Sequence, residues 1–146
     1  RFKALIVGSG EVEKNLKEYI TKKNLQKEVK IVSYNSNPFP LLKKADLFIL
    51  TSLYEGLPNV LLEALVLKKI VFSTNCQTGP REILENGKNG TLFKVKDYKS
   101  LSRKILEFDK DKKKYRKKLQ NLDNSLKRFD QKRNLSKYYS IIKKIL

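Results

Sequence analysis

Short apolar, β-branched runs alternate with helical patterns over the first two thirds of the chain. This alternation is typical of βα units, in which each parallel strand is followed by a helix. The runs that we expect to form strands are Lys3–Val7, Val29–Ser33, Leu47–Leu50, Ile70–Ser73 and Thr91–Val95. Because these runs are apolar along nearly their whole length, they predict helices on both faces of the sheet. The sequence therefore predicts an α/β fold with a Rossmann-like parallel sheet flanked by helices.

Helical spacing of apolar residues places helices between these strands and after the last one. Val12, Leu16, Tyr19 and Ile20 share one helical face, and Pro58–Leu67 is a compact apolar run with proline near its first turn. The strand pattern ends at Asp97, and three C-terminal helices are the simplest interpretation of the residues after it. Their faces are marked by Leu101, Ile105 and Phe108, by Leu119, Leu122, Leu126 and Phe129, and by Tyr138, Ile141, Ile142 and Ile145.

The chain has 146 residues, of which 40% are hydrophobic, and this size predicts one domain over residues 1–146. Its net charge of +18 is concentrated in residues 110–146, the basic tail, which hold 14 Lys and Arg against 3 Asp. Polyanions, anionic membrane surfaces and phosphate-bearing ligands are therefore candidate partners. Because the chain begins at Arg1 and contains no Met, we expect it to be part of a longer protein.

Residues suited to metal or disulfide chemistry are scarce. The chain has no His and a single cysteine, Cys76, which excludes a disulfide framework and a multi-cysteine metal site. We expect a reducing, cytoplasmic setting, since no signal-peptide pattern is present and no apolar run approaches the roughly 20 residues of a membrane span. Asp109-Lys110-Asp111 has two carboxylates that suit Mg²⁺, but its place between Lys-rich helices favours a helix cap.

Gly8-Ser9-Gly10 follows the first predicted strand, where a dinucleotide-binding loop would present its amides to a pyrophosphate. Glu13 stands where that motif requires its third glycine. The pattern therefore favours a plain strand-to-helix turn over a nicotinamide or flavin site.

The stretch Asp46–Glu63 is predicted to form an apolar strand, a loop and an apolar helix. In a parallel sheet, ligands bind outside the carboxyl ends of the strands, where this loop must lie. Gly56 lets the backbone approach a ligand closely, and Pro58 has no amide to leave unpaired in the first helical turn. The free amides that come next would point from the positive helix end toward a phosphate, and they belong to Asn59, Val60 and Leu61. The sequence thus predicts an anion site.

Glu63 is a carboxylate in an otherwise apolar helix, where burial without a partner would be costly. It lies roughly 7 to 8 Å along the helix axis from Pro58, close enough to accept hydrogen bonds from a ribose whose phosphates sit at the helix N-terminus. An exposed helix face, or a local cap of the preceding loop, is the alternative interpretation.

These residues carry a family resemblance that spans nearly the whole chain. Two glutamates separated by seven residues, Glu55 and Glu63, stand in a strand, loop and helix context, and further blocks are present in order. The blocks are Asn37-Pro38-Phe39, Lys44-Ala45-Asp46-Leu47-Phe48, Ser52–Ala64, Gly79-Pro80-Arg81-Glu82-Ile83-Leu84 and Asn86-Gly87-Lys88-Asn89-Gly90-Thr91-Leu92. Together they resemble the C-terminal, donor-binding domain of family 4 glycosyltransferases.

The resemblance implies one half of a GT-B fold, with the first strand and the acceptor domain outside this chain. It implies transfer of a sugar from a nucleotide-diphosphate donor, with UDP the expected nucleotide, with retention of configuration and without a metal or other cofactor. The expected acceptor is a glycan or glycolipid of a bacterial surface polysaccharide, held mainly by the missing domain. We expect the isolated domain to be inactive, because the Arg and Lys that clamp the donor phosphates in relatives precede this chain.

The resemblance also implies roles for individual residues. Glu63 would bind the ribose hydroxyls, and the loop around Ser33 and Tyr34 would border the base. The donor sugar would face Glu55 and the backbone of Gly56, Leu57 and Pro58, and the diphosphate would meet the amides of Asn59, Val60 and Leu61. Aimed amide dipoles stabilise a departing diphosphate, and a carboxylate near the sugar eases positive charge at its ring. Glu55 is therefore the expected catalytic residue.

Three further possibilities stay open. Arg81 would add charge near the phosphates, or would form an ion pair with Glu85 one helical turn away. The basic tail would attach the protein to the inner face of the cytoplasmic membrane, or would be an ordinary solvated tail. The alternative function is a basic nucleic-acid-binding module, suggested by Lys and Arg interleaved with aromatic residues, although no nucleic-acid-binding motif is present.

Overall fold

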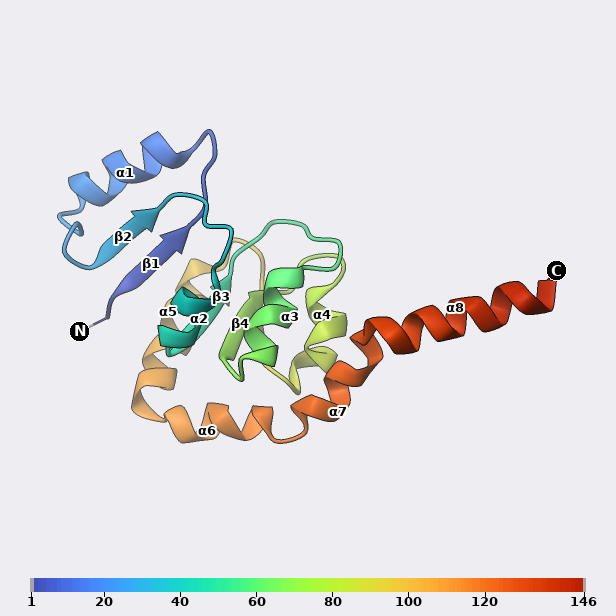
Figure 1. The fold of residues 1–146 in the computed structure, drawn as a ribbon. Coiled ribbons are helices and arrows are strands. Elements are labelled where there is room, and N and C mark those ends of the chain that lie inside the picture. The colour runs from blue at the N-terminus through green and yellow to red at the C-terminus, as the bar shows by residue number, and fades with distance from the viewer. Residues whose placement is uncertain (1, 146) are drawn as a thin grey trace. The chain divides into compact units, whose positions relative to one another are not determined.

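The computed structural model describes residues 2–145 and contains two compact units, residues 1–40 and residues 41–146 (Figure 1). In the first unit, β1 (Ala4–Val7) and β2 (Val29–Val32) form a two-stranded parallel sheet, and α1 (Glu13–Lys22) connects them. Gly8 ends β1 with a φ of +143°, which favours glycine, and its amide donates to Val32 O at 2.9 Å. The Gly8-Ser9-Gly10 segment therefore acts as the expected strand-to-helix turn.

The second unit is built on a three-stranded parallel sheet in the order β3-β4-β5. These strands are Leu47–Leu50, Ile70–Thr74 and Thr91–Phe93. The helices around them are α2 (Phe39–Lys44), which begins in the first unit, α3 (Asn59–Val66), α4 (Pro80–Ile83) and α5 (Tyr98–Lys110), with the short 3₁₀ helix η1 (Glu85–Gly87) before β5. All five predicted strands are confirmed to within two residues.

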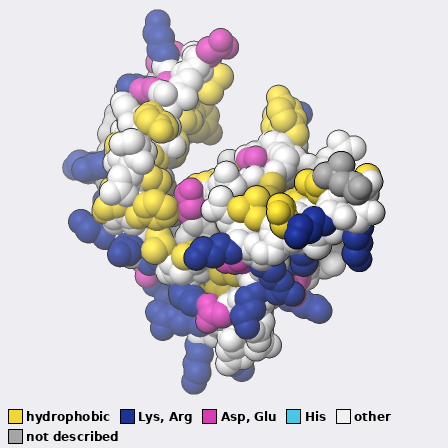
Figure 2. All heavy atoms as spheres, turned by 45° about the vertical axis from the view of Figure 1, so that its right-hand side comes forward, with side chains coloured by type: hydrophobic (Ala, Val, Ile, Leu, Met, Phe, Trp, Pro, Cys, Tyr) yellow, Lys and Arg dark blue, Asp and Glu magenta, His cyan; other side chains and the backbone are white. Residues whose placement is uncertain are grey.

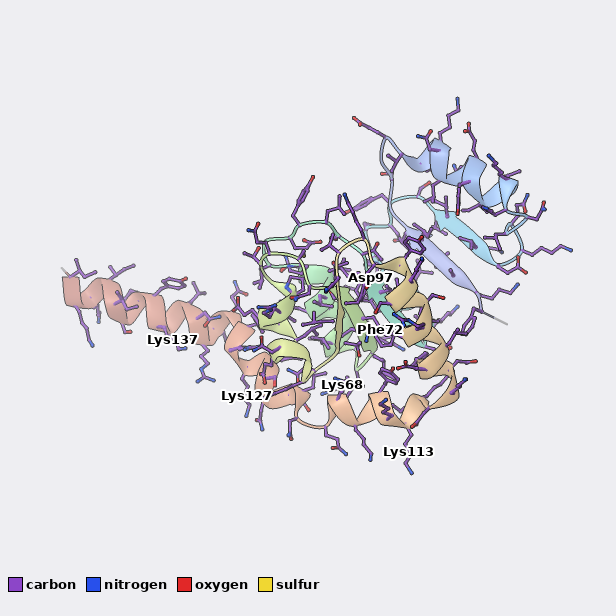
Figure 3. All side chains as sticks on the ribbon, turned by 180° about the vertical axis from the view of Figure 1, so that it is seen from behind. Lys68, Phe72, Asp97, Lys113, Lys127 and Lys137 are labelled. Carbon is purple, nitrogen blue, oxygen red and sulfur yellow. The ribbon has the colours of Figure 1, made fainter. Side chains whose placement is uncertain are left out.

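The core of the second unit lies on both faces of β4, whose five residues are all buried. Val71 packs on one face with residues of α3 and α4, among them Leu61, Leu65 and Ile83. On the other face Phe72 contacts Phe108 of α5 and Tyr115, with ring centroids 6.1 and 5.3 Å apart. Figure 3 labels Phe72 on the sheet. Alternate residues of a strand point to opposite faces, so β4 is covered by helices on both sides, as its apolar sequence predicts.

The C-terminal third differs from the three predicted helices. The first is confirmed as α5, whose N-cap Asp97 accepts a 2.9 Å hydrogen bond from the Ser100 amide. The last is confirmed as α8 (Gln131–Ile145). The middle one is wrong as a single helix, because the segment is divided into α6 (Lys112–Arg116), η2 (Lys117–Leu119), α7 (Leu122–Leu126) and η3 (Lys127–Phe129).

Packing explains why this middle segment bends. Tyr115 of α6 is buried against the rings of Phe72 and Phe108. Leu122 of α7 is instead buried in the cluster of Leu61 and Leu65, on the other side of β4. A straight helix would not follow the surface from one cluster to the other. Local apolar spacing shows that residues are helical but not where the helix must turn.

Three further features were not predicted from the sequence. The strands form two parallel sheets, one in each unit, with the orders β1-β2 and β3-β4-β5. The apolar strand β1 is exposed along its length. Helices α2 and α4 were not predicted, because runs of four to six residues are too short to show helical periodicity.

On the face shown in Figure 2, Lys and Arg side chains outnumber Asp and Glu. Every residue of α8 is exposed except Asn134, which is half-buried. Within residues 2–145 no helix has the length and apolar character needed to cross a membrane.

Candidate functional site

Two loops at the carboxyl ends of neighbouring strands form the centre of the candidate site. The Glu55 loop, residues 51–58, joins β3 to α3, and the Gly79 loop, residues 75–79, joins β4 to α4 (Figure 1). Because β3 and β4 are paired in parallel, both loops leave the sheet at the same edge. This is the edge at which α/β sheets bind their ligands.

Glu55 is half-buried in its loop, and its side chain is held by a neighbour. Ser52 Oγ donates a hydrogen bond of 2.6 Å to Glu55 Oε1. The residues on either side of Glu55, Tyr54 and Gly56, are exposed, as is Leu57. The loop therefore presents a carboxylate of fixed direction beside open backbone, which suits a group that must meet a bound ligand.

The Gly79 loop supports the Glu55 loop from the side of β4. Thr74 Oγ1 at the end of β4 donates to Ser52 O at 2.7 Å, and Thr78 Oγ1 donates to Glu55 O. Gly79 has a φ of +73°, and a Cβ atom on it would lie 2.0 Å from Gly56 O. Only glycine allows this backbone contact.

The N-terminus of α3 differs in two respects from the predicted anion site. Pro58 is the N-cap rather than the first helical residue, with φ −70° and ψ 101°, and it is buried. The amide of Leu61 was predicted to be free, but it donates to Pro58 O at 3.0 Å. This bond joins residues three positions apart, as in the tight 3₁₀-type turn that often begins a helix. The phosphate contact of Leu61 stays a prediction. The predicted amides of Asn59 and Val60 remain at the helix end.

Glu63 lies one turn into α3 and is half-buried beside Ala64 and Leu65, both fully buried. Among residues 2–145, no hydrogen bond or ion pair reaches its carboxylate. The alternative that Glu63 caps the preceding loop is therefore wrong. A half-buried carboxylate without a protein partner is free to accept hydrogen bonds from ligand hydroxyl groups.

Arg81 follows the Gly79 loop in the first turn of α4 and is exposed. Its Nε donates to Asn75 Oδ1 at 3.2 Å, so the Gly79 loop orients the guanidinium. The alternative ion pair with Glu85 is wrong, because Glu85 Oε1 lies 3.6 Å from Arg128 Nη2 instead. Arg128 reaches this position because it also donates to the carbonyl oxygens of Glu82 and Ile83 at the end of α4.

Ser33 and Tyr34 follow β2 in the first unit, and both are exposed. Their expected place beside the base stays a prediction, as does the assignment of both units to one nucleotide-sugar-binding domain.

One member of the acidic pair Asp109 and Asp111 is a helix cap. Asp111 accepts a 2.9 Å hydrogen bond from the Lys114 amide at the start of α6, as the sequence favours. Within the described part of the chain, no group of three or more His, Cys, Asp and Glu side chains is placed to hold a metal ion.

Sequence reasoning missed the residues that support the site, namely Ser52, Thr74, Asn75, Thr78 and the contact role of Gly79. Hydroxyl and amide residues at the end of a buried strand and in the loop after it are the signal that could have indicated Thr74, Asn75 and Thr78. Their partners lie in another loop, so the contacts themselves could not be read from spacing.

The comparisons with known proteins agree with this geometry. The family described as "Glycosyl transferases group 1" matches residues 1–129. An uncharacterized glycosyltransferase of Methanocaldococcus jannaschii is 50% identical over 82 residues, which are 56% of this chain and 20% of that protein. The N-acetylgalactosamine-N,N'-diacetylbacillosaminyl-diphospho-undecaprenol 4-alpha-N-acetylgalactosaminyltransferase of Campylobacter jejuni is 31% identical over 119 residues, 80% of this chain and 33% of that protein.

Among solved structures, Anabaena HepE in complex with UDP-glucose superposes with a TM-score of 0.78 and 29% identity, covering 88% of this chain and 37% of that chain. The matched residues are a fifth of the first curated relative and a third of the second.

The prediction of an α/β fold that forms one half of a GT-B structure is confirmed. The family match supports the predicted glycosyltransferase and not the alternative, a nucleic-acid-binding module. The chain belongs to the glycosyl transferases of group 1.

Proposed function

We propose that this chain is the donor-binding half of a retaining glycosyltransferase that uses a UDP-sugar and no metal. The observation that carries the proposal is the arrangement of Glu55 and Glu63 around the N-terminus of α3. One carboxylate is aimed by Ser52, and the other is half-buried with no partner within residues 2–145. Between them, the amides of Asn59 and Val60 lie at the positive end of the helix.

The chemistry of sugar transfer matches these groups. As the bond to the leaving diphosphate breaks, negative charge grows on its oxygens and positive charge on the sugar ring. Amide dipoles at a helix N-terminus and the guanidinium of Arg81 stabilise the negative charge without a metal. Glu55 lies on the loop before the helix and would act on the sugar, whereas Glu63, one turn into the helix, would hold the ribose.

The choice of UDP is supported by the likeness to HepE, whose structure contains UDP-glucose. The test is an amide NMR titration of this chain with uridine, guanosine and adenosine diphosphates, which detects affinities as weak as about 1 mM. We expect saturable shifts confined to Gly56–Val60 and Glu63, with UDP alone. Shifts confined to the basic tail, or none with any nucleotide, would contradict the proposal.

The whole protein, in this proposal, transfers the sugar to a glycan or glycolipid held by an acceptor domain outside this chain, in bacterial surface polysaccharide synthesis. The isolated chain would then bind donor and transfer nothing. The name of the Campylobacter jejuni relative specifies an undecaprenol-linked acceptor, which is a membrane lipid. A lipid-linked acceptor would place the active enzyme at the inner face of the cytoplasmic membrane.

A second role, membrane attachment through the tail, is favoured by α8. Six large apolar side chains of this helix are each more than half exposed, namely Leu135, Tyr138, Tyr139, Ile141, Ile142 and Ile145. The same helix has five Lys and Arg and no Asp or Glu between Gln131 and Ile145. An apolar face bordered by cations is suited to an anionic lipid surface.

A further inference from the structure

We infer that Thr78 and Gly79 are positioning residues that hold the Glu55 loop in its binding shape before the donor arrives. The inference rests on the proposed function of that loop. Neither residue was assigned a role from the sequence, and neither is itself proposed to touch the donor. They act on the site through the backbone of Glu55 and Gly56.

The first contact is a hydrogen bond. Thr78 Oγ1 donates to Glu55 O, so a side chain of one loop fixes the backbone of the other at the proposed catalytic residue. Thr78 is exposed, and the bond joins residues 23 positions apart in the sequence. Removing the hydroxyl group would therefore release the Glu55 loop without opening the core.

The second contact is steric. A Cβ atom on Gly79 would lie 2.0 Å from Gly56 O and 2.6 Å from Pro58 Cδ, far inside van der Waals contact. Gly79 thus packs its bare Cα against the turn that leads into α3, and its φ of +73° adds strain for any other residue. The loop is held between this contact and the start of the helix.

The Glu55 loop needs such support because little else holds its middle. Leu53, Tyr54, Gly56 and Leu57 are all exposed, and Gly56 has the backbone freedom of glycine. A loop ordered only by its ligand would lose conformational entropy on binding and so reduce affinity. With Thr78 and Gly79 in place, that entropy is lost during folding instead.

The experiment compares Thr78→Val with Thr78→Ser in this chain. Valine keeps the shape of threonine and removes the donor, whereas serine keeps the donor. We expect Thr78→Val to shift the amides of Glu55–Leu57 in the nucleotide-free protein and to weaken UDP binding about three- to tenfold, while Thr78→Ser stays within about twofold. The melting temperatures of both variants should stay within a few degrees of the parent, since one exposed hydrogen bond contributes about 1 kcal/mol, whereas a general folding defect would lower them further.

Gly79→Ala is the second variant, and it should move the same amides further and weaken UDP binding more. Unchanged loop shifts and UDP affinity in Thr78→Val would overturn the inference, and so would equal losses in Thr78→Val and Thr78→Ser. A parent chain that binds no UDP would instead overturn the proposed function, and the inference with it. If the parent binds UDP and Thr78→Val binds it with the same affinity, the inference fails while the proposed function stands.

Discussion

Ser52 Oγ and Glu55 Oε1 are joined by a hydrogen bond of 2.6 Å across three residues of the Glu55 loop. The backbone of Ser52 is fixed in turn, because its carbonyl oxygen accepts from Thr74 Oγ1 at 2.7 Å. The direction of the Glu55 carboxylate is thus set by the end of β4, through one intermediate residue. A carboxylate held in this way loses little entropy when it meets a substrate.

Ser52→Ala should lower turnover of the full-length enzyme about tenfold, because Glu55 loses the bond that aims it. The Michaelis constant for the donor should change less, since the proposed ribose and phosphate contacts do not involve Ser52. Steady-state kinetics with the UDP-sugar donor measures both quantities, and Ser52→Thr, which keeps the hydroxyl group, is the control. A raised Michaelis constant with unchanged turnover would assign Glu55 to uniform donor binding instead.

Glu63→Gln should weaken UDP binding several-fold while leaving the free energy of unfolding nearly unchanged. The amide keeps the shape of the side chain, and no protein partner within residues 2–145 is lost, but a charged acceptor for the ribose hydroxyls is removed. Calorimetric titration with UDP measures the affinity. Glu18→Gln, an exposed change of the same charge on α1, is the control. Equal UDP affinities in parent and Glu63→Gln would remove Glu63 from the ribose role.

The accuracy of the sequence predictions depends on the range of the interactions involved. Strand β4 was predicted well because its burial shows in the apolar run Ile70-Val71-Phe72, and Asp111 because capping is a contact within one turn. The contacts of Thr78 with Glu55 and of Arg128 with α4 join residues 23 and 46 positions apart. No local pattern encodes such pairs. The closed Leu61 amide was missed for another reason, since the pattern locates a helix end but not the geometry of its first turn.

Lys69→Met should lower the free energy of unfolding by about 1 to 2 kcal/mol. Lys69 Nζ donates to Lys43 O at 2.6 Å and to Ala45 O at 3.0 Å, so it caps the carbonyl end of α2 from the start of β4. Urea unfolding measures the change. The neighbouring variant Lys68→Met is the control, because Lys68 only forms an exposed ion pair with Asp123 and should cost no more than about 0.5 kcal/mol. Equal losses in the two variants would contradict the capping role.

Tyr115→Phe should change how stability depends on alkaline pH. Burial, and then the charge and hydrogen bond of Glu107, raise the pKa of Tyr115 above its ordinary value of 10.0. Since the folded state holds this proton more tightly, the contribution is fully present below the unfolded pKa and is lost as pH rises through the folded pKa. The phenylalanine variant lacks this loss. We therefore measure the unfolding free energies of variant and parent at about pH 7 and about pH 11. Relative to the parent, the variant should be more stable at about pH 11 than at about pH 7.

Tyr98→Phe is the matched control for that measurement, because Tyr98 is 72% exposed at the start of α5. Lysine titration affects the parent and both variants alike and cancels in the comparison. A pH dependence of Tyr115→Phe identical to that of the parent would show that the Tyr115 proton is not coupled to folding.

Membrane attachment should depend on the charge of α8 and not on net charge alone. Lys143→Glu with Lys144→Glu places two acids in the last turn of α8, whereas Lys110→Glu with Lys113→Glu makes the same change at exposed positions of α5 and α6. We expect the first pair to lose most binding to vesicles of phosphatidylglycerol and phosphatidylcholine, because each cation at the surface contributes about 1 kcal/mol. The second pair should retain it. Sedimentation at low salt measures the bound fraction, and equal losses in the two pairs would mean that the tail attracts anions without docking α8.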